Sequence, residues 1–107
     1  MPGARSHFGR TIGRWNAFQI PDAPILVAYG TVALAAAQDY TAARATAGQT
    51  LLVIGIIRMH SPRGWQVGCG QSKETFRWVS THPLLKDAEA QVSDIIASMC
   101  QEQQHRR

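Results

Sequence analysis

The 107-residue chain has few of the motifs that mark metal-binding, nucleotide-binding and hydrolytic enzymes. It has only two cysteines, Cys69 and Cys100, and neither has a cysteine or histidine partner at the short spacing of a structural zinc site. A glycine-rich phosphate loop and a Gly-x-Ser-x-Gly nucleophile elbow are also missing. The sequence therefore predicts no metal ion and no cofactor.

Long apolar runs are missing as well. The run over residues 23–37 is shorter than the ~20 residues that span a bilayer, and polar or small residues interrupt it at 29–31. No cationic start followed by an apolar core and a small-residue cleavage site precedes this run. We therefore expect a cytoplasmic protein that does not bind membranes, with both thiols reduced.

The sequence also lacks a run of basic residues within its central part. The formal net charge is +4, but residues 25–100 hold six Lys or Arg against five Asp or Glu, so most of the excess lies in the two ends. Nucleic-acid-binding domains usually gather basic residues on one folded surface, whereas charged ends are usually solvated tails. The composition therefore does not favour nucleic acid as a partner.

What the chain does have is the composition of one globular domain, with 45% hydrophobic and 17% charged residues. We divide it into an irregular N-terminal arm (1–24), a single α+β domain (25–100) and a polar C-terminal tail (101–107). The arm interleaves arginines with aromatic and apolar residues, among them Trp15 and Phe18. These side chains could pack the arm onto the domain or a partner subunit, or could stack on single-stranded nucleic acid.

The first part of the domain predicts a strand, a helix and a second strand. Residues 25–32 are rich in β-branched and aliphatic side chains, and Tyr29 lies on one face of the expected strand. Residues 33–47 are dominated by alanine, the best helix former, and Gly48 is suited to end the helix. Residues 51–59 are the most apolar run and predict a central strand buried on both faces.

A hairpin is expected next. Residues 60–64 have the composition of a turn, and residues 65–70 alternate in the manner of a partner strand that begins with Trp65. Gly68 and Gly70 fall on the same face of this strand. Two glycines on one face indicate a bulge, or a close approach of backbone or ligand.

Helices are expected in the remainder of the domain. Ser72 is a good N-cap, so the sequence predicts a helix that starts there and turns Phe76 and Val79 inward. The step at His82 and Pro83 breaks this helix, because proline suits the first turn of a helix and not its interior. Residues 84–99 repeat apolar side chains at helical spacing and predict an amphipathic helix.

The expected order is therefore strand, helix, strand, strand, helix. Helices that pack on one face of such a sheet give an α+β fold, and the βαββα order indicates a ferredoxin-like sandwich that lacks only its last strand. A three-stranded sheet leaves an exposed face and an exposed edge. Because a second subunit would cover both, we expect a homodimer.

The strand-to-helix passage at residues 67–76 has the layout of a known family element. Its Ser72, Glu74, Thr75 and Phe76 fit that element, and Trp78 and His82 follow where the family carries aromatic and histidine residues. Over about residues 25–97 the chain resembles the antibiotic-biosynthesis monooxygenase-like family, although Gly70 stands where the family carries tryptophan. These are small dimeric α+β barrel proteins, among them cofactor-independent quinone-forming oxygenases and haem-degrading enzymes.

The resemblance implies a small cofactor-independent monooxygenase-like or ligand-binding protein acting on an aromatic or polyketide-type small molecule. His82 would be the catalytic residue, since an imidazole can act as general base on a phenolic substrate. Trp65, Trp78 and Tyr29 would bind the substrate in a pocket between sheet and helix. The alternatives are a capping or surface role for His82 and a core role for the tryptophans. Cys69 is interpreted as a small buried residue.

A second hypothesis is a non-catalytic interaction module, of a kind that a mobile element could encode. It would bind protein or nucleic acid through the basic aromatic arm. The two hypotheses require different surroundings for His82. An enzyme needs a closed apolar pocket between the sheet and this residue, whereas a module needs only a filled core.

Overall fold

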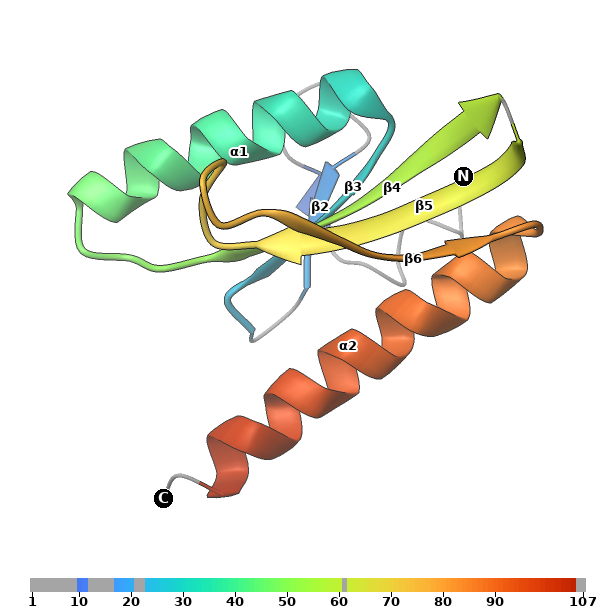
Figure 1. Cartoon of the computed structure of the whole chain (residues 1–107). Coiled ribbons are helices and arrows are strands. Elements are labelled where there is room, and N and C mark those ends of the chain that lie inside the picture. Colours follow the sequence, from blue (N-terminus) through green and yellow to red (C-terminus); the bar gives the residue numbers. More distant parts are fainter. Residues whose placement is uncertain (1–9, 12–16, 21–22, 61, 106–107) are drawn as a thin grey trace.

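The computed structural model describes residues 10–11, 17–20, 23–60 and 62–105 (Figure 1). The elements in chain order are β1 (Arg10–Thr11), β2 (Ala17–Gln19), β3 (Ile25–Tyr29), α1 (Thr31–Thr46), β4 (Leu52–His60), β5 (Arg63–Gly70), β6 (Arg77–His82) and α2 (Leu85–His105). Neither of the helices in these residues has the length and apolar character needed to cross a bilayer.

The six strands of the described residues form one sheet in which neighbours in sequence are also neighbours in space, from β1 to β6. β3 and β4 run parallel and are joined by α1, whereas every other pair of neighbours is antiparallel. A parallel pair needs a crossover connection, and a helix is its usual form. The sequence supplies it in the alanine-rich segment that becomes α1.

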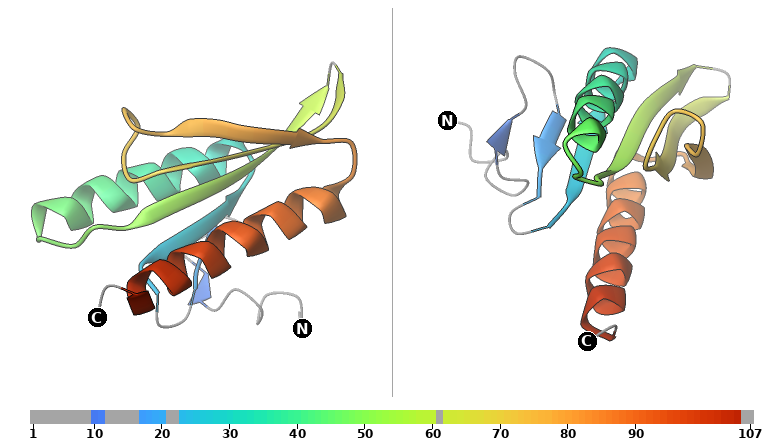
Figure 2. Two further views of the ribbon diagram at one scale, coloured as in Figure 1. Left: turned by 60° about the horizontal axis from the view of Figure 1, so that its bottom comes forward. Right: turned by 90° about the vertical axis from the view of Figure 1, so that its left-hand side faces the viewer.

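The two helices cover opposite faces of the sheet, as both views of Figure 2 show. The core on the α1 side consists of Ala17, Leu26, Ala28, Ala33, Leu34, Ala37, Leu51 and Val53. The core on the α2 side consists of Ile25, Val27, Ile54, Ile56, Val67, Ala88 and Val92. Successive residues of β3 and β4 therefore enter different cores, as the two-residue period of a strand requires.

The α+β class is confirmed, as are the strand, helix, strand and strand over residues 25–70. Two features differ from the ferredoxin-like sandwich that the sequence predicts. The strands joined by α1 are direct neighbours, and the helices do not share one face. The reason lies in β3 and β4, which are apolar on both sides. A second apolar face must be covered, and the amphipathic α2 covers it.

The helix that the sequence predicts at Ser72 is wrong. Residues 72–75 form a turn and Arg77–His82 form the strand β6. In the turn, the amides of Gln71 and Ser72 donate to Thr75 Oγ1 at 3.2 and 3.0 Å, and the amide of Thr75 donates to Ser72 Oγ at 3.2 Å. Ser72 therefore caps a turn. The β-branched and aromatic side chains that follow suit a strand better than a helix.

The N-terminal arm contributes to the sheet. β1 and β2 lie within residues 1–24, and Phe18 of β2 is buried and pairs with Val27 of β3. The irregular structure expected for the whole arm is therefore wrong for these strands, because β1 pairs with β2 and β2 pairs with β3. Trp15 lies outside the described residues.

The expectation for Gly68 and Gly70 is confirmed. The pairing of β5 with β6 shifts by one residue between Val67 and Gly68, which is a bulge. A β-carbon on Gly68 would lie 2.7 Å from Cε3 of Trp78. On Gly70 it would lie 2.5 Å from Cα of Phe76, which leaves no space for a side chain. The glycines therefore let the 71–76 loop and β6 approach β5.

Candidate functional site at the β6 edge

The four residues expected to form a pocket lie on two faces of the sheet. Tyr29 and Trp65 pack against the core on the α2 side, and His82 is opposite Trp65 in the pairing of β5 with β6. Trp78 is opposite Gly68 and contacts Phe76, which packs against the core on the α1 side. The bulge separates Trp78 from the others. The fold therefore does not bring these four side chains together.

Tyr29 holds α2 against the sheet. Its hydroxyl donates a hydrogen bond of 2.9 Å to Oε2 of Glu89, a residue of α2. Burial raises the pKa of Tyr29 above its usual range, and the hydrogen bond to Glu89 and the charge of that carboxylate raise it further. The phenol is therefore neutral in the folded protein, with its hydroxyl group engaged by the helix.

Tyr29→Phe is expected to lower the free energy of unfolding by about 1 kcal/mol at pH 7, because it removes one half-buried hydrogen bond. The folded-state pKa of Tyr29 is raised, so the stability that the phenol provides is complete below pH 10 and is lost as the pH rises further. Urea unfolding of both proteins at pH 7 and above pH 10 measures this. If the two proteins differed in free energy of unfolding by the same amount at pH 7 and above pH 10, the prediction would be contradicted.

His82 belongs to a row of side chains that crosses three strands on the α2 side of the sheet. His82 Nε2 and Ser80 Oγ lie 2.8 Å apart. Arg58 of β4 is opposite Trp65 of β5, and its guanidinium carbon lies 5.9 Å from the centre of the indole ring. We call Arg58, Trp65 and His82 the cationic row. The sequence did not indicate it, because its members come from three strands whose pairing register is set only in the fold.

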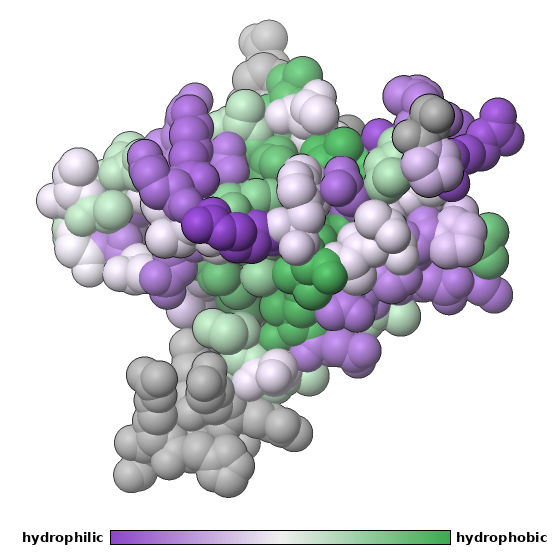
Figure 3. Space-filling view, viewed as in Figure 1, coloured by the Kyte–Doolittle hydropathy of each residue, from purple (hydrophilic) through white to green (hydrophobic). Residues whose placement is uncertain are grey.

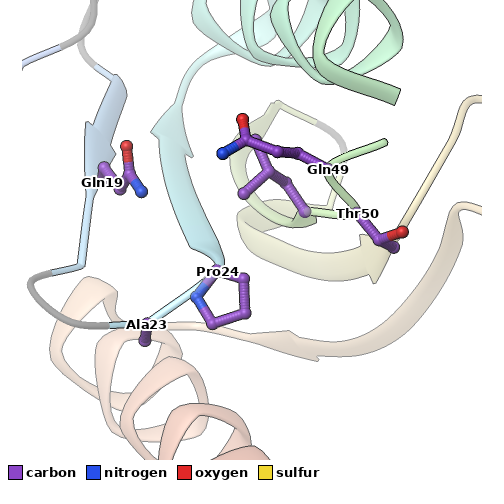
Figure 4. Close-up of a pocket in the computed structure, with 6 residues that line it drawn as sticks. Gln19, Ala23, Pro24, Gln49 and Thr50 are labelled. Carbon is purple, nitrogen blue, oxygen red and sulfur yellow. The ribbon is translucent and has the colours of Figure 1, made fainter. Parts of the chain in front are cut away.

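The structure shows two open hollows that lie apart from the predicted site residues. One, of about 370 Å³, is lined by Gln19, Ala23, Pro24, Gln49, Thr50 and Leu51. Figure 4 shows Gln19 and Gln49 on either side of β3, with Ala23 and Pro24 near the start of this strand. The other, of about 390 Å³, is lined by Thr31, Val32, Ala35, Ala36 and Asp39 of α1. Neither is an enclosed chamber.

No three His, Cys, Asp or Glu side chains gather as metal ligands in the part of the chain that the structure describes. Cys69 of β5 is half-buried beside the core on the α2 side, and burial raises the pKa of its thiol. A raised pKa favours the neutral thiol over the nucleophilic thiolate. Cys69 is partly buried, whereas the sequence predicts a buried residue.

β6 forms the outer edge of the sheet among the described strands. Large apolar side chains are exposed along it and just after it: Trp78 by 46%, Val79 by 50% and Leu84 by 52%. Figure 3 shows apolar surface on both sides of β6, toward α1 and toward α2. Exposed apolar surface beside an unpaired strand is typical of an interaction site. The sequence did not indicate this surface, because its residues were assigned to a helix.

Short-range contacts fix the loop that leads into β6. Nη1 of Arg77 donates to the carbonyl oxygens of Glu74 and Phe76, each at 2.8 Å. The ring of Phe76 meets the ring of Trp78 edge-on, with 5.1 Å between centroids. Lys73 forms an ion pair of 3.4 Å with Asp39 of α1. The start of β6 and the indole of Trp78 are therefore held in place by their own neighbours.

Comparison with known proteins gave no relative. No protein-family model matches the chain, no curated protein matches its sequence and no solved structure matches its fold. The resemblance to the antibiotic-biosynthesis monooxygenase-like family therefore stays a prediction. The helix that this resemblance places after Ser72 is, in the fold, a turn followed by β6.

Proposed function

We propose that this protein is a non-catalytic interaction module that joins a second copy of itself through the outer edge of β6. The observation that carries the proposal is the edge itself, which displays two exposed apolar side chains, Trp78 and Val79, on an outermost strand. An incoming strand adds main-chain hydrogen bonds along such an edge, and its side chains provide specificity.

The edge has little of the usual protection against pairing. Natural edge strands carry lysine, proline or an inward-pointing charge, or are very short. Residues 77–82 contain no lysine, proline or acidic residue, and six residues make an edge of ordinary strand length. β6 carries two features that protect edge strands, the exposed charge of Arg77 at its start and the bulge at Val79. An accessible edge of this kind supports strand addition.

A second copy fits the edge because the bulge makes its side-chain pattern symmetric. Arg77 and His82 lie opposite Cys69 and Trp65, on the α2 side. Trp78 and Thr81, opposite Gly68 and Gln66, lie on the α1 side. An antiparallel pair of β6 strands related by a two-fold axis would set Trp78 of one copy opposite Thr81 of the other. Each side chain then lies beside a side chain of the partner on the same face, and the two sheets join into one continuous sheet.

The space between sheet and helix also favours a module over an enzyme. The α2 side is filled by Ile54, Ile56, Val67, Ala88 and Val92, which are at most 2% exposed. Trp65 packs against this cluster. The oxygenase-type activity and the substrate-binding roles that the resemblance implies for His82 and the aromatic residues stay predictions.

The test is the concentration dependence of the molecular mass in solution. We expect wild type to form a dimer, and Val79→Lys to raise the dimer dissociation constant about tenfold or more, because the two-fold axis brings the added charges close to each other. Light scattering behind size exclusion, and sedimentation at several concentrations, measure this. Circular dichroism shows whether the variant is folded.

Val32→Lys is the matched control, since Val32 is 60% exposed on α1, away from the edge. It is expected to dimerise as wild type does. A wild type that stays monomeric at the highest accessible concentration would overturn the proposal. So would equal weakening by the two variants, because general charge repulsion and not β6 would then be responsible.

A further inference from the structure

The described strands carry basic residues and no acidic ones, although the two kinds are nearly equal in number within residues 25–100. β4, β5 and β6 carry Arg58, Arg63 and Arg77 and contain no aspartate or glutamate. The acidic residues within 25–100 lie on the helices or in the 71–76 loop: Asp39, Glu74, Asp87, Glu89 and Asp94. The domain is nearly neutral as a whole but has a basic sheet. Nucleic acid was not favoured as a partner because basic residues do not cluster in the sequence, but in the fold Arg58, Arg63 and Arg77 share the sheet.

The basic residues gather at the end of the sheet where β4 turns into β5. Arg58, Trp65 and His82 form the cationic row, and His60 lies opposite Arg63 one step farther along the hairpin. Arg58, His60 and Arg63 are exposed, and Trp65 is half-buried. All five occupy the α2 side, since they continue the alternation of Ile54, Ile56 and Val67.

We infer that the cationic row, with His60 and Arg63, binds single-stranded nucleic acid. Proteins that bind single strands combine cations that track the phosphates with an aromatic ring on which a base stacks. Here Arg58 and Arg63 supply fixed charge, and Trp65 supplies a ring that lies opposite Arg58 and two residues from Arg63 along β5. The half-buried indole is anchored by the core, so that little side-chain freedom is lost on binding.

An acidic peptide would meet the same charges but would gain less from the ring. Carboxylates pair with guanidinium groups, whereas a base has a π face that can stack on indole and on the guanidinium plane. Trp65 is therefore the residue that separates the two ligand classes. The inference does not depend on the β6 dimer, because Arg58, Arg63 and Trp65 belong to β4 and β5, whereas the dimer forms through β6.

The experiment is fluorescence anisotropy with a labelled oligothymidylate of about 12 nucleotides and the full chain, over a range of salt concentrations. We expect binding that weakens with salt. Removal of one phosphate contact from a single strand makes the slope of log K against log salt shallower by about 0.7. Arg58→Gln and Arg63→Gln should each show this change, and the double variant should bind at least about tenfold more weakly.

Arg44→Gln is the matched control, because Arg44 lies over the ring of Tyr40 at 5.1 Å on α1, outside the row. It should bind almost as wild type does. Trp65→Leu should bind about tenfold more weakly, and Trp65→Phe should retain most of the affinity, with thermal unfolding used to confirm that both are folded.

Three results would overturn the inference. One is the absence of binding by wild type at low salt. Another is an Arg44→Gln variant that loses as much affinity as the double variant. The third is equal affinity for poly-glutamate of the same charge, or for a DNA duplex of the same length, because the ring would then contribute nothing.

Discussion

Replacement of Gly70 by alanine is expected to lower the free energy of unfolding by about 3 kcal/mol, at the upper end of the usual cost of overpacking. A β-carbon at this position would lie 2.5 Å from Cα of Phe76, 2.7 Å from its backbone nitrogen and 2.9 Å from the carbonyl carbon of Thr75. All three are backbone atoms, so no change of rotamer relieves the contact. The loop and the start of β6 must move away from β5.

Gly48→Ala separates this steric effect from the general cost of replacing a glycine. Gly48 has φ of 86°, and an added β-carbon would meet nothing within 4 Å. Only the left-handed backbone opposes the substitution, at about 1 kcal/mol. Urea unfolding of the two variants measures the difference. Equal losses would show that Phe76 and the loop can yield, which contradicts the tight approach of β6.

Val92→Asp is expected to cost about 4 kcal/mol and to release α2 from the sheet. Val92 is 2% exposed and packs with Val67, Ile54 and Ile56 on the α2 side. A carboxylate there would lose its water without gaining a partner. Thermal unfolding gives the loss, and tryptophan fluorescence reports on the three tryptophans, of which Trp65 packs against the same core.

Val32→Asp is the control for this substitution and should slightly raise the free energy of unfolding. Val32 is 60% exposed in the first turn of α1, which has no acidic residue. A negative charge there interacts favourably with the helix dipole, by roughly 0.5 kcal/mol. If Val92→Asp were tolerated as well as Val32→Asp, the contact of α2 with the sheet would not be a core contact.

The functional interpretation changed because two local assignments changed. The Ser72 segment was expected to begin a helix and instead leads into a strand, which exposes Trp78 and Val79 along an edge. His82 was expected at a helix break and lies at the end of that strand, in register with Trp65. Both changes move the proposed site from an enclosed pocket to the surface of the sheet.

The sequence by itself determined the elements with a strong period or composition. The apolar, β-branched runs predict β3 and β4, the alternating run predicts β5, the alanine-rich run predicts α1, and the helical spacing after Leu84 predicts α2. These segments could be recognised because their preferences are local. The close approach indicated by Gly68 and Gly70 was also predicted, since only a glycine fits beside another backbone.

Only the tertiary structure decided β6, the opposite placement of the helices and the cationic row. A six-residue edge strand has weak local preference, and its state depends on pairing with β5. Which face a helix covers depends on the apolar faces that the assembled sheet offers. Arg58, Trp65 and His82 are separated in sequence, and strand register alone makes them neighbours. Register is a non-local property, which one strand by itself does not determine.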